Sequence, residues 1–104
     1  MIDSVKVGVL RYAVCLVEDL RDDEGKGLNG WIRHDPCLIQ IEAKLNPQVQ
    51  KVCAIHEALH GWATQAGLAQ DEILIDSFAY GIYGLLRDNP ALVAWLCEGD
   101  GDAN

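Results

Sequence analysis

Residues 46–67 read NPQVQKVCAIHEALHGWATQAG, and this stretch decides the fold. Asn46 is a residue type that caps helices, and Pro47 at the first helical position gives up no hydrogen bond. Apolar residues then recur at helical spacing, at positions 49, 52, 53, 59 and 63, until Gly67 supplies a stop. The stretch therefore predicts one long helix with the motif H-E-x-x-H inside it.

Short apolar runs before this helix predict β-strands. Valines alternate with Lys6 and Gly8 over residues 5–9, and residues 12–17 form a second run. A polar, glycine-rich loop follows at 18–30, and two more apolar runs lie at 31–33 and 37–41. Because the connections are too short for helical crossovers, we expect a small, mostly antiparallel sheet of about three to four strands.

Two further helices are predicted after the long one. Asp71 can cap a helix that runs to about Arg87, and Asn89-Pro90 can start a short helix through Leu96 that ends near Gly99. Strands come first and helices follow, which is typical of an α+β fold with helices on one face of the sheet. We therefore expect one domain over residues 1–99 and a frayed acidic tail at 100–104.

Charge excludes some classes of partner. The 104 residues include 8 Lys and Arg against 16 Asp and Glu, a formal net charge of −8. Nucleic acid and anionic membrane surfaces both attract basic proteins, so neither is expected as a partner. The N-terminus lacks the basic and apolar regions of a signal peptide, and no run approaches the ~20 apolar residues of a membrane helix. The sequence therefore predicts a cytoplasmic protein.

The four cysteines do not form a metal-binding pattern. They lie at positions 15, 37, 53 and 97, without a Cys-x-x-Cys pair. Zinc fingers and ribbons need such closely spaced pairs. We expect the cysteines to be reduced and to act as small apolar residues of the core.

The motif at residues 56–60, HEALH, predicts a zinc site. Residues four apart on a helix lie on one face about 5–6 Å apart, so both imidazoles can reach one zinc ion at roughly 2.0–2.1 Å. Glu57, beside the first histidine, can hold a metal-bound water and accept its proton. We therefore expect His56 and His60 as ligands and Glu57 as the general base.

A catalytic zinc site commonly has a third protein ligand. A turn after Gly67 would let the next helix fold back beside the first, bringing Glu72 to the metal as the expected ligand. Asp71 or Asp76 could take this role instead. Asp76 lies one turn beyond Glu72 and could accept the second N–H of a ligand histidine, which fixes the tautomer.

H-E-x-x-H followed by E-x-x-x-D resembles the pattern of the glutamate-zincin metallopeptidases, the thermolysin-like group. Residues 72–79 are similar to the E-x-x-x-D-x-F-A stretch of ImmA/IrrE-type peptidases, and the order of elements over 5–97 is similar to that of small phage and prophage proteins of this kind. The specific motifs cover about residues 56–79. The resemblance implies a minimal zincin-like fold and the same roles as above: two histidines and Glu72 on zinc, Glu57 as base and Asp76 behind the ligands.

The resemblance also implies how a substrate binds. In zincins a peptide joins an edge strand of the sheet as an extra strand, and the run at 37–41, with Trp31 nearby, is the expected edge. Larger relatives use additional domains to bring a donor to the transition state, whereas this minimal chain must supply its own. The candidate donors are Tyr80, Tyr83 and His34.

The predicted reaction is zinc-dependent hydrolysis of a peptide bond. Glu57 would deprotonate a zinc-bound water, which attacks the carbonyl, and would pass the proton to the leaving amine. One alternative is a catalytically inactive, zinc-stabilised binding module, which a closed shell with Asp76 bound to the metal would favour. Another is a regulatory protein from a prophage switch that docks without cleaving. The oligomeric state stays open, because a short exposed edge strand can pair with another chain.

Overall fold

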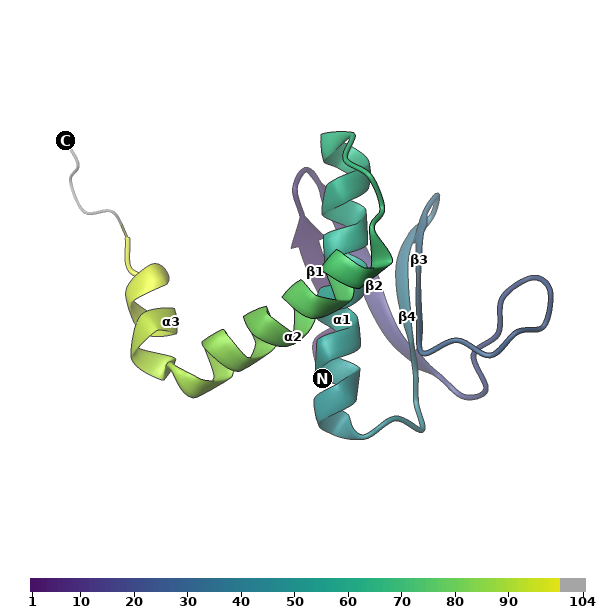
Figure 1. Ribbon diagram of the computed structural model, residues 1–104, viewed down its shortest axis with the longest axis horizontal. Helices are drawn as coiled ribbons and strands as arrows, with labels where there is room; N and C mark the ends of the chain where they lie inside the picture. The colour runs from purple at the N-terminus through teal and green to yellow at the C-terminus, as the bar shows by residue number, and fades with distance from the viewer. Residues whose placement is uncertain (100–104) are drawn as a thin grey trace.

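The computed structural model describes residues 1–99, and the tail predicted at 100–104 lies outside the described residues. Strands precede helices, as expected (Figure 1). The elements are β1 (Ser4–Val7), β2 (Leu10–Val17), β3 (Gly30–His34), β4 (Cys37–Glu42), α1 (Pro47–Ala66), α2 (Glu72–Asp88) and α3 (Pro90–Leu96). The predicted α+β class and the helix limits are confirmed.

The four strands form one mixed sheet in the order β1-β2-β4-β3. β1 pairs with β2 and β3 pairs with β4 in antiparallel fashion, while β2 and β4 are parallel, with Val14 opposite Ile39. The parallel pair arises because the chain passes through the 18–29 loop and β3 before it returns as β4. The sheet is therefore mostly antiparallel, as expected.

The prediction that residues 37–41 form an edge strand was wrong. The run at 37–41 belongs to β4, which lies between β2 and β3 and is hydrogen-bonded on both sides. β3 precedes β4 in the chain but pairs outside it, so the free edge on this side of the sheet is β3. Trp31, expected near the edge, lies on this strand and is half-buried, with the Arg33 guanidinium 4.3 Å from its ring centroid.

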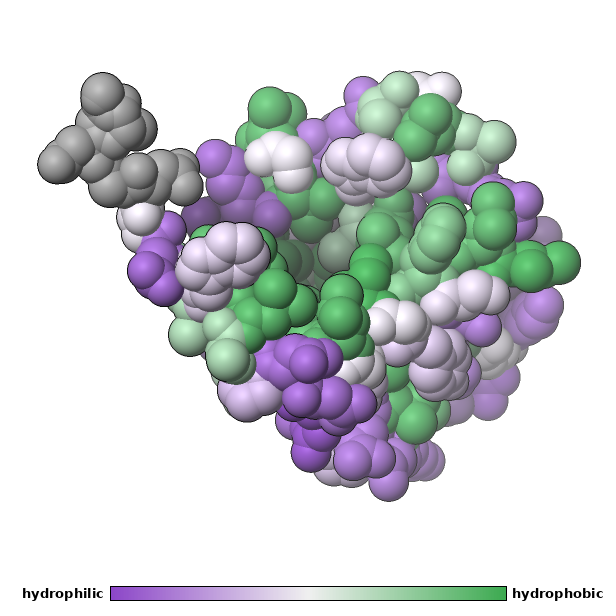
Figure 2. Space-filling view, turned by 60° about the vertical axis from the view of Figure 1, so that its left-hand side comes forward, coloured by the Kyte–Doolittle hydropathy of each residue, from purple (hydrophilic) through white to green (hydrophobic). Residues whose placement is uncertain are grey.

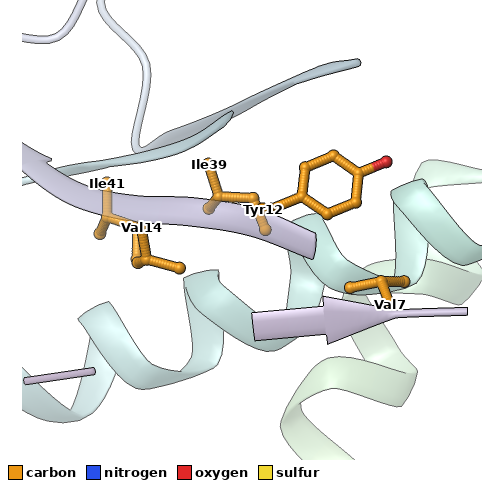
Figure 3. Packing of buried hydrophobic residues seen from close by; sticks show 5 residues of the cluster. All are labelled: Val7, Tyr12, Val14, Ile39 and Ile41. Carbon is orange, nitrogen blue, oxygen red and sulfur yellow. The ribbon is translucent and has the colours of Figure 1, made fainter. Parts of the chain in front are cut away.

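The hydrophobic core lies between the sheet and α1. Side chains that alternate along β2 and β4 point to this face, together with one from β1 (Figure 3). The buried set is Val7, Tyr12, Val14, Ile39 and Ile41. Among the described helices only α1 packs on the sheet; α2 packs against α1, and α3 against α2.

The predicted helix ends are present and bring the start of α2 back to α1. Asn46 Oδ1 accepts a hydrogen bond from Gln48 N at 2.8 Å, and Gly67 ends α1 with a φ of 70°, a conformation that suits glycine. Asp71 Oδ1 accepts from Leu74 N at 3.1 Å and caps α2. The short segment between these caps reverses the chain, so that the start of α2 faces the middle of α1.

The end of α2 and α3 extend away from the rest of the molecule, and we call residues 80–96 the arm (Figure 1). α2 has only Ile75 and Ala79 buried, and α3 has no buried residue. The molecule is 53 Å long with a radius of gyration of 15.0 Å, above the roughly 13 Å of a compact chain of this length. Hydrophobic side chains gather beside the arm (Figure 2).

Two further sequence expectations can be compared with the structure. Cys15, Cys37 and Cys53 are partly buried, but Cys97 is exposed after α3, so its expected place in the core was wrong. The reason is that α3 contacts only α2 among the described elements and has no core to join. No helix within residues 1–99 is both long and apolar enough to cross a membrane.

Candidate metal centre

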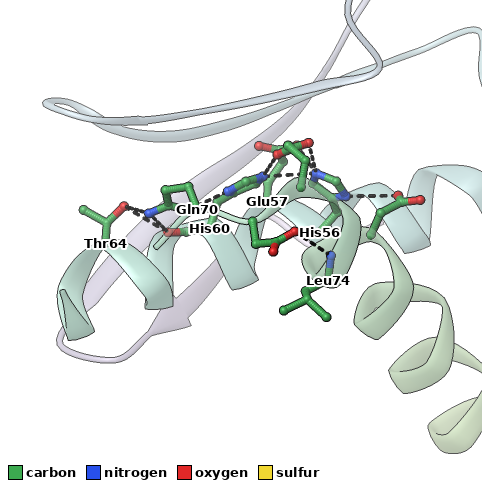
Figure 4. Close-up of polar contacts among 9 residues, drawn as sticks. His56, Glu57, His60, Thr64, Gln70 and Leu74 are labelled. Carbon is green, nitrogen blue, oxygen red and sulfur yellow. Dashed lines mark hydrogen bonds and ion pairs between the residues drawn. The ribbon is translucent and has the colours of Figure 1, made fainter. Parts of the chain in front are cut away.

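The H-E-x-x-H residues of α1 open into a cleft of about 530 Å³. The cleft is bounded by the loop before β3, by β3 itself, by α1 and by the first turns of α2. His56, Glu57 and His60 project into it from α1, and α2 crosses in front of them (Figure 4). The residues predicted from the motif therefore lie in one accessible hollow.

Three ligand atoms converge in this cleft. His56 Nε2 lies 3.2 Å from His60 Nε2 and 3.4 Å from Glu72 Oε2, while Glu72 Oε1 contacts His60 Nε2. One ligand atom from each residue lies within 4.8 Å of the others, so the three side chains could hold one metal ion. Of the three carboxylates considered for the third position, Asp71 caps α2 instead, which leaves Glu72 closest to both imidazoles.

The other nitrogen of each imidazole also has a partner. Asp76 Oδ1 lies 3.3 Å from His56 Nδ1, and Gln70 Oε1 lies 2.7 Å from His60 Nδ1. The Gln70 amide nitrogen donates to Thr64 Oγ1 at 2.9 Å, which orients its oxygen toward the histidine. Because both partners are acceptors, a neutral imidazole at either position would carry its proton on Nδ1.

This tautomer leaves the two Nε2 lone pairs facing each other and the Glu72 carboxylate. Three acceptors without a hydrogen between them repel one another unless a cation is shared among them. The three side chains could therefore share a cation.

Glu57 is the one buried charged residue of the described chain, with 8% of its surface exposed. It fits beneath β3 because position 30 is glycine: a Cβ there would lie 2.9 Å from Glu57 Oε2. Burial raises the pKa of the Glu57 carboxyl and Glu72 adds to this, while His56 and His60 oppose it. A carboxylate with a raised pKa beside a cation site is suited to take up and release a proton.

The three candidate donors lie in different parts of the structure. Tyr80 lines the cleft. Tyr83 lines a different hollow, between the arm and α1, and its hydroxyl accepts from Arg87 Nη1 at 3.1 Å. His34 Nδ1 is hydrogen-bonded to Tyr12 Oη at 2.8 Å. Among the described residues, only Tyr80 of the three lines the cleft.

Two residues of the site were missed by the sequence analysis. Gln70 lies ten residues after His60, and only the path of the turn between the helices brings it there. Gly30 marks the start of β3, where a glycine next to a strand was available as a signal of close approach to another group.

Comparisons of the chain with protein-family models, curated proteins and solved structures found no match. The resemblance to glutamate zincins therefore stays a prediction that rests on the motif residues 56–60 and 72–76.

Proposed function

We propose that this chain is a zinc-dependent peptidase of the minimal zincin type. The observation that carries the proposal is the convergence of two imidazole nitrogens and the Glu72 carboxylate in a cleft, directly beside the buried Glu57 carboxyl. Two histidines and one carboxylate form a ligand set typical of catalytic zinc, which keeps its fourth position open.

Two of the three spacings between ligand atoms are compatible with zinc. Ligands at roughly 2.0–2.1 Å in a tetrahedral arrangement lie about 3.3 Å from one another. The two histidine nitrogens are 3.2 Å apart, and His56 Nε2 is 3.4 Å from Glu72 Oε2. Asp76 approaches Nδ1 of His56 and not the metal-facing nitrogen, an arrangement that supports an open fourth position.

The residues of the chain would divide the work of hydrolysis. A zinc ion held by His56, His60 and Glu72 would acidify a water molecule and polarise the scissile carbonyl. Glu57, with Oε2 3.9 Å from His56 Nε2, would accept the proton and deliver it to the leaving amine. Tyr80 would donate a hydrogen bond to the developing oxyanion. The free edge of β3 would bind the substrate as an added strand.

The test begins with metal content. We expect about one zinc ion per chain by elemental analysis and almost none in His56→Ala, because one imidazole and one carboxylate bind zinc weakly. The zinc-loaded protein is then screened against a library of peptides, with Glu57→Gln as the matched control. This variant should keep zinc and lose roughly 10²–10⁴-fold in cleavage rate, the usual contribution of a general base.

Absence of zinc uptake on titration would contradict the proposal as a whole. Zinc uptake without cleavage of any peptide would contradict the peptidase and leave a zinc-stabilised binding module. A Glu57→Gln variant as active as the parent would contradict the role of Glu57.

A further inference from the structure

α2 presents three different faces. One carries Glu72, Asp76 and Tyr80 toward the cleft, and a second packs Ile75 and Ala79 against α1. At about 100° per residue, a third face lies roughly opposite the cleft. It consists of Leu74, Phe78, Gly81 and Leu85, and we call these four residues the free face.

The free face is apolar and uncovered. Leu74 is 51% exposed, Phe78 57% and Leu85 53%. A Cβ built on Gly81 would meet no atom within 4 Å. No described element therefore shields this face from water.

The spacing of the free face fits a second helix. Its four positions follow one another at intervals of four, three and four residues, the spacing of a seam between two packed helices. The small Gly81 in the middle permits close approach of another backbone. A helix is therefore the shape that this face would accept.

The net charge of the chain indicates which partner supplies this second helix. Residues 77–86, SFAYGIYGLL, contain no charged side chain, in a protein with a net charge of −8. Two copies of such an acidic chain repel each other over most of their surface, and an uncharged face is where they can meet without that cost. A basic partner, in contrast, would be attracted to the acidic surface elsewhere.

The apolar surface exposed on α2 and α3 is large for a monomer. α2 and α3 carry eight of the exposed large hydrophobic residues, each 38–80% exposed. With side chains of about 150–250 Å², the eight leave on the order of 800 Å² exposed, of which Leu74, Phe78 and Leu85 on the free face supply roughly 300 Å². Monomers rarely expose an apolar patch of more than a few hundred Å².

We propose that the protein forms a homodimer in which α2 of one copy packs antiparallel on α2 of the other through the free face. A two-fold axis near Gly81 would place Phe78 of each copy opposite Leu85 of the other, as an isologous interface requires. The cleft stays open in this arrangement, because Glu72 and Asp76 point to the opposite side of the helix. The dimer holds whether or not the metal site is catalytic.

The test is the mass of the full chain in solution, measured by light scattering and sedimentation velocity from micromolar to submillimolar concentration. We expect twice the chain mass of 11.4 kDa. Phe78→Glu should weaken the dimer by about 30-fold or more, because it buries a charge at the seam. The matched control is Trp62→Glu, an aromatic residue on α1 that is 51% exposed and lies outside the free face; it should remain a dimer.

Leu85→Glu is a second disrupting variant in case Phe78→Glu does not fold, and circular dichroism checks both. A parent protein that stays monomeric over the whole range would overturn the proposal, as would monomer that sediments with phosphatidylcholine vesicles, which would indicate a lipid partner. A dimer that survives both substitutions would also overturn it and would indicate pairing through another surface, such as the edge of β3.

Discussion

The two halves of α2 have similar backbones and opposite surroundings. Over residues 72–79, one side of the helix packs on α1 and another borders the cleft, where the carboxylates contact histidines. Residues 80–88 continue the helix without a gap, but no residue there is buried. The same local rules build both halves, so the difference comes from what lies next to them. A helix can be predicted from its own residues, whereas the use of each face depends on its neighbours.

The glycines of the two regions differ in the space around them. A Cβ on Gly30 or Gly61 would lie 2.9 Å from a neighbouring side chain, while one on Gly81 or Gly84 would meet nothing within 4 Å. Around the cleft, glycine makes room for specific groups. On the arm, glycine leaves room that the described chain does not fill.

Among the substitutions that compare the two regions, Gly30→Ala has the largest expected effect, a loss of peptide cleavage. The added methyl would push the Glu57 carboxylate, 2.9 Å away, out of position, and a displacement of about 1 Å at a reacting group can cost on the order of 10²-fold. Because the end of a glutamate side chain moves easily, stability and zinc uptake should change little. Cleavage rates at saturating zinc, beside a thermal melt of each variant, measure both.

Gly27→Ala is the matched control for this substitution, since a Cβ at position 27, in the loop before β3, meets nothing within 4 Å. It should cleave like the parent. Equal cleavage rates in the two variants would show that the fit of Glu57 under β3 is not needed for catalysis. Loss of zinc in Gly30→Ala would show that the ligands, and not the base, had moved.

Much of the fold could be predicted because its signals are local. Asn46, Gly67 and Asp71 end or begin helices through bonds to residues within four positions, and all three caps are present. The outer position of β3 could not be predicted in this way. It depends on β2 and β4 pairing in parallel across an intervening loop and strand, which no short pattern encodes.

The candidate site divides in the same way. His56 and His60 are brought together by helical periodicity alone, and Glu72 and Asp76 follow once the second helix is known to fold back. Gln70 was missed because its contact depends on the path of the turn. The position of Tyr83 in another hollow could not be predicted either, because the sequence does not give the angle at which α2 crosses α1.

The next effect in size is that of Gln70→Ala on zinc affinity. The Gln70 oxygen accepts from His60 Nδ1 at 2.7 Å, and loss of such a partner of a ligand histidine typically costs 10–100-fold in metal affinity. Gln70→Glu keeps an acceptor and should restore most of the affinity, which a merely structural role would not predict. Competition with a chromogenic chelator measures the dissociation constants.

Gln48→Ala, at an exposed position in the first turn of α1, serves as the control for loss of an amide side chain. It should bind zinc like the parent. Unchanged affinity in Gln70→Ala would mean that the tautomer of His60 does not depend on the turn between the helices, and that the cleft is less tightly organised than the contrast with the arm implies.

The smallest expected effects are changes in the free energy of unfolding when one glycine in each region is replaced by alanine. Alanine is favoured over glycine inside a helix by about 1 kcal/mol, so Gly84→Ala, with no atom within 4 Å of the new Cβ, should be stabilised by up to about that amount. Gly61→Ala gains the same helical preference, but its Cβ would lie 2.9 Å from Ile32 Cδ1 and 3.4 Å from Tyr12 Oη. Overpacking a core costs about 1–3 kcal/mol, so a net loss of roughly 1 kcal/mol is expected.

Urea denaturation of both variants at one protein concentration, in the Phe78→Glu background to remove dimer effects, gives the two free energies of unfolding. Changes of the same sign and size would mean that α1 and the sheet can separate enough to admit a methyl group, and that the packed and open sides of the molecule differ less than their glycines indicate.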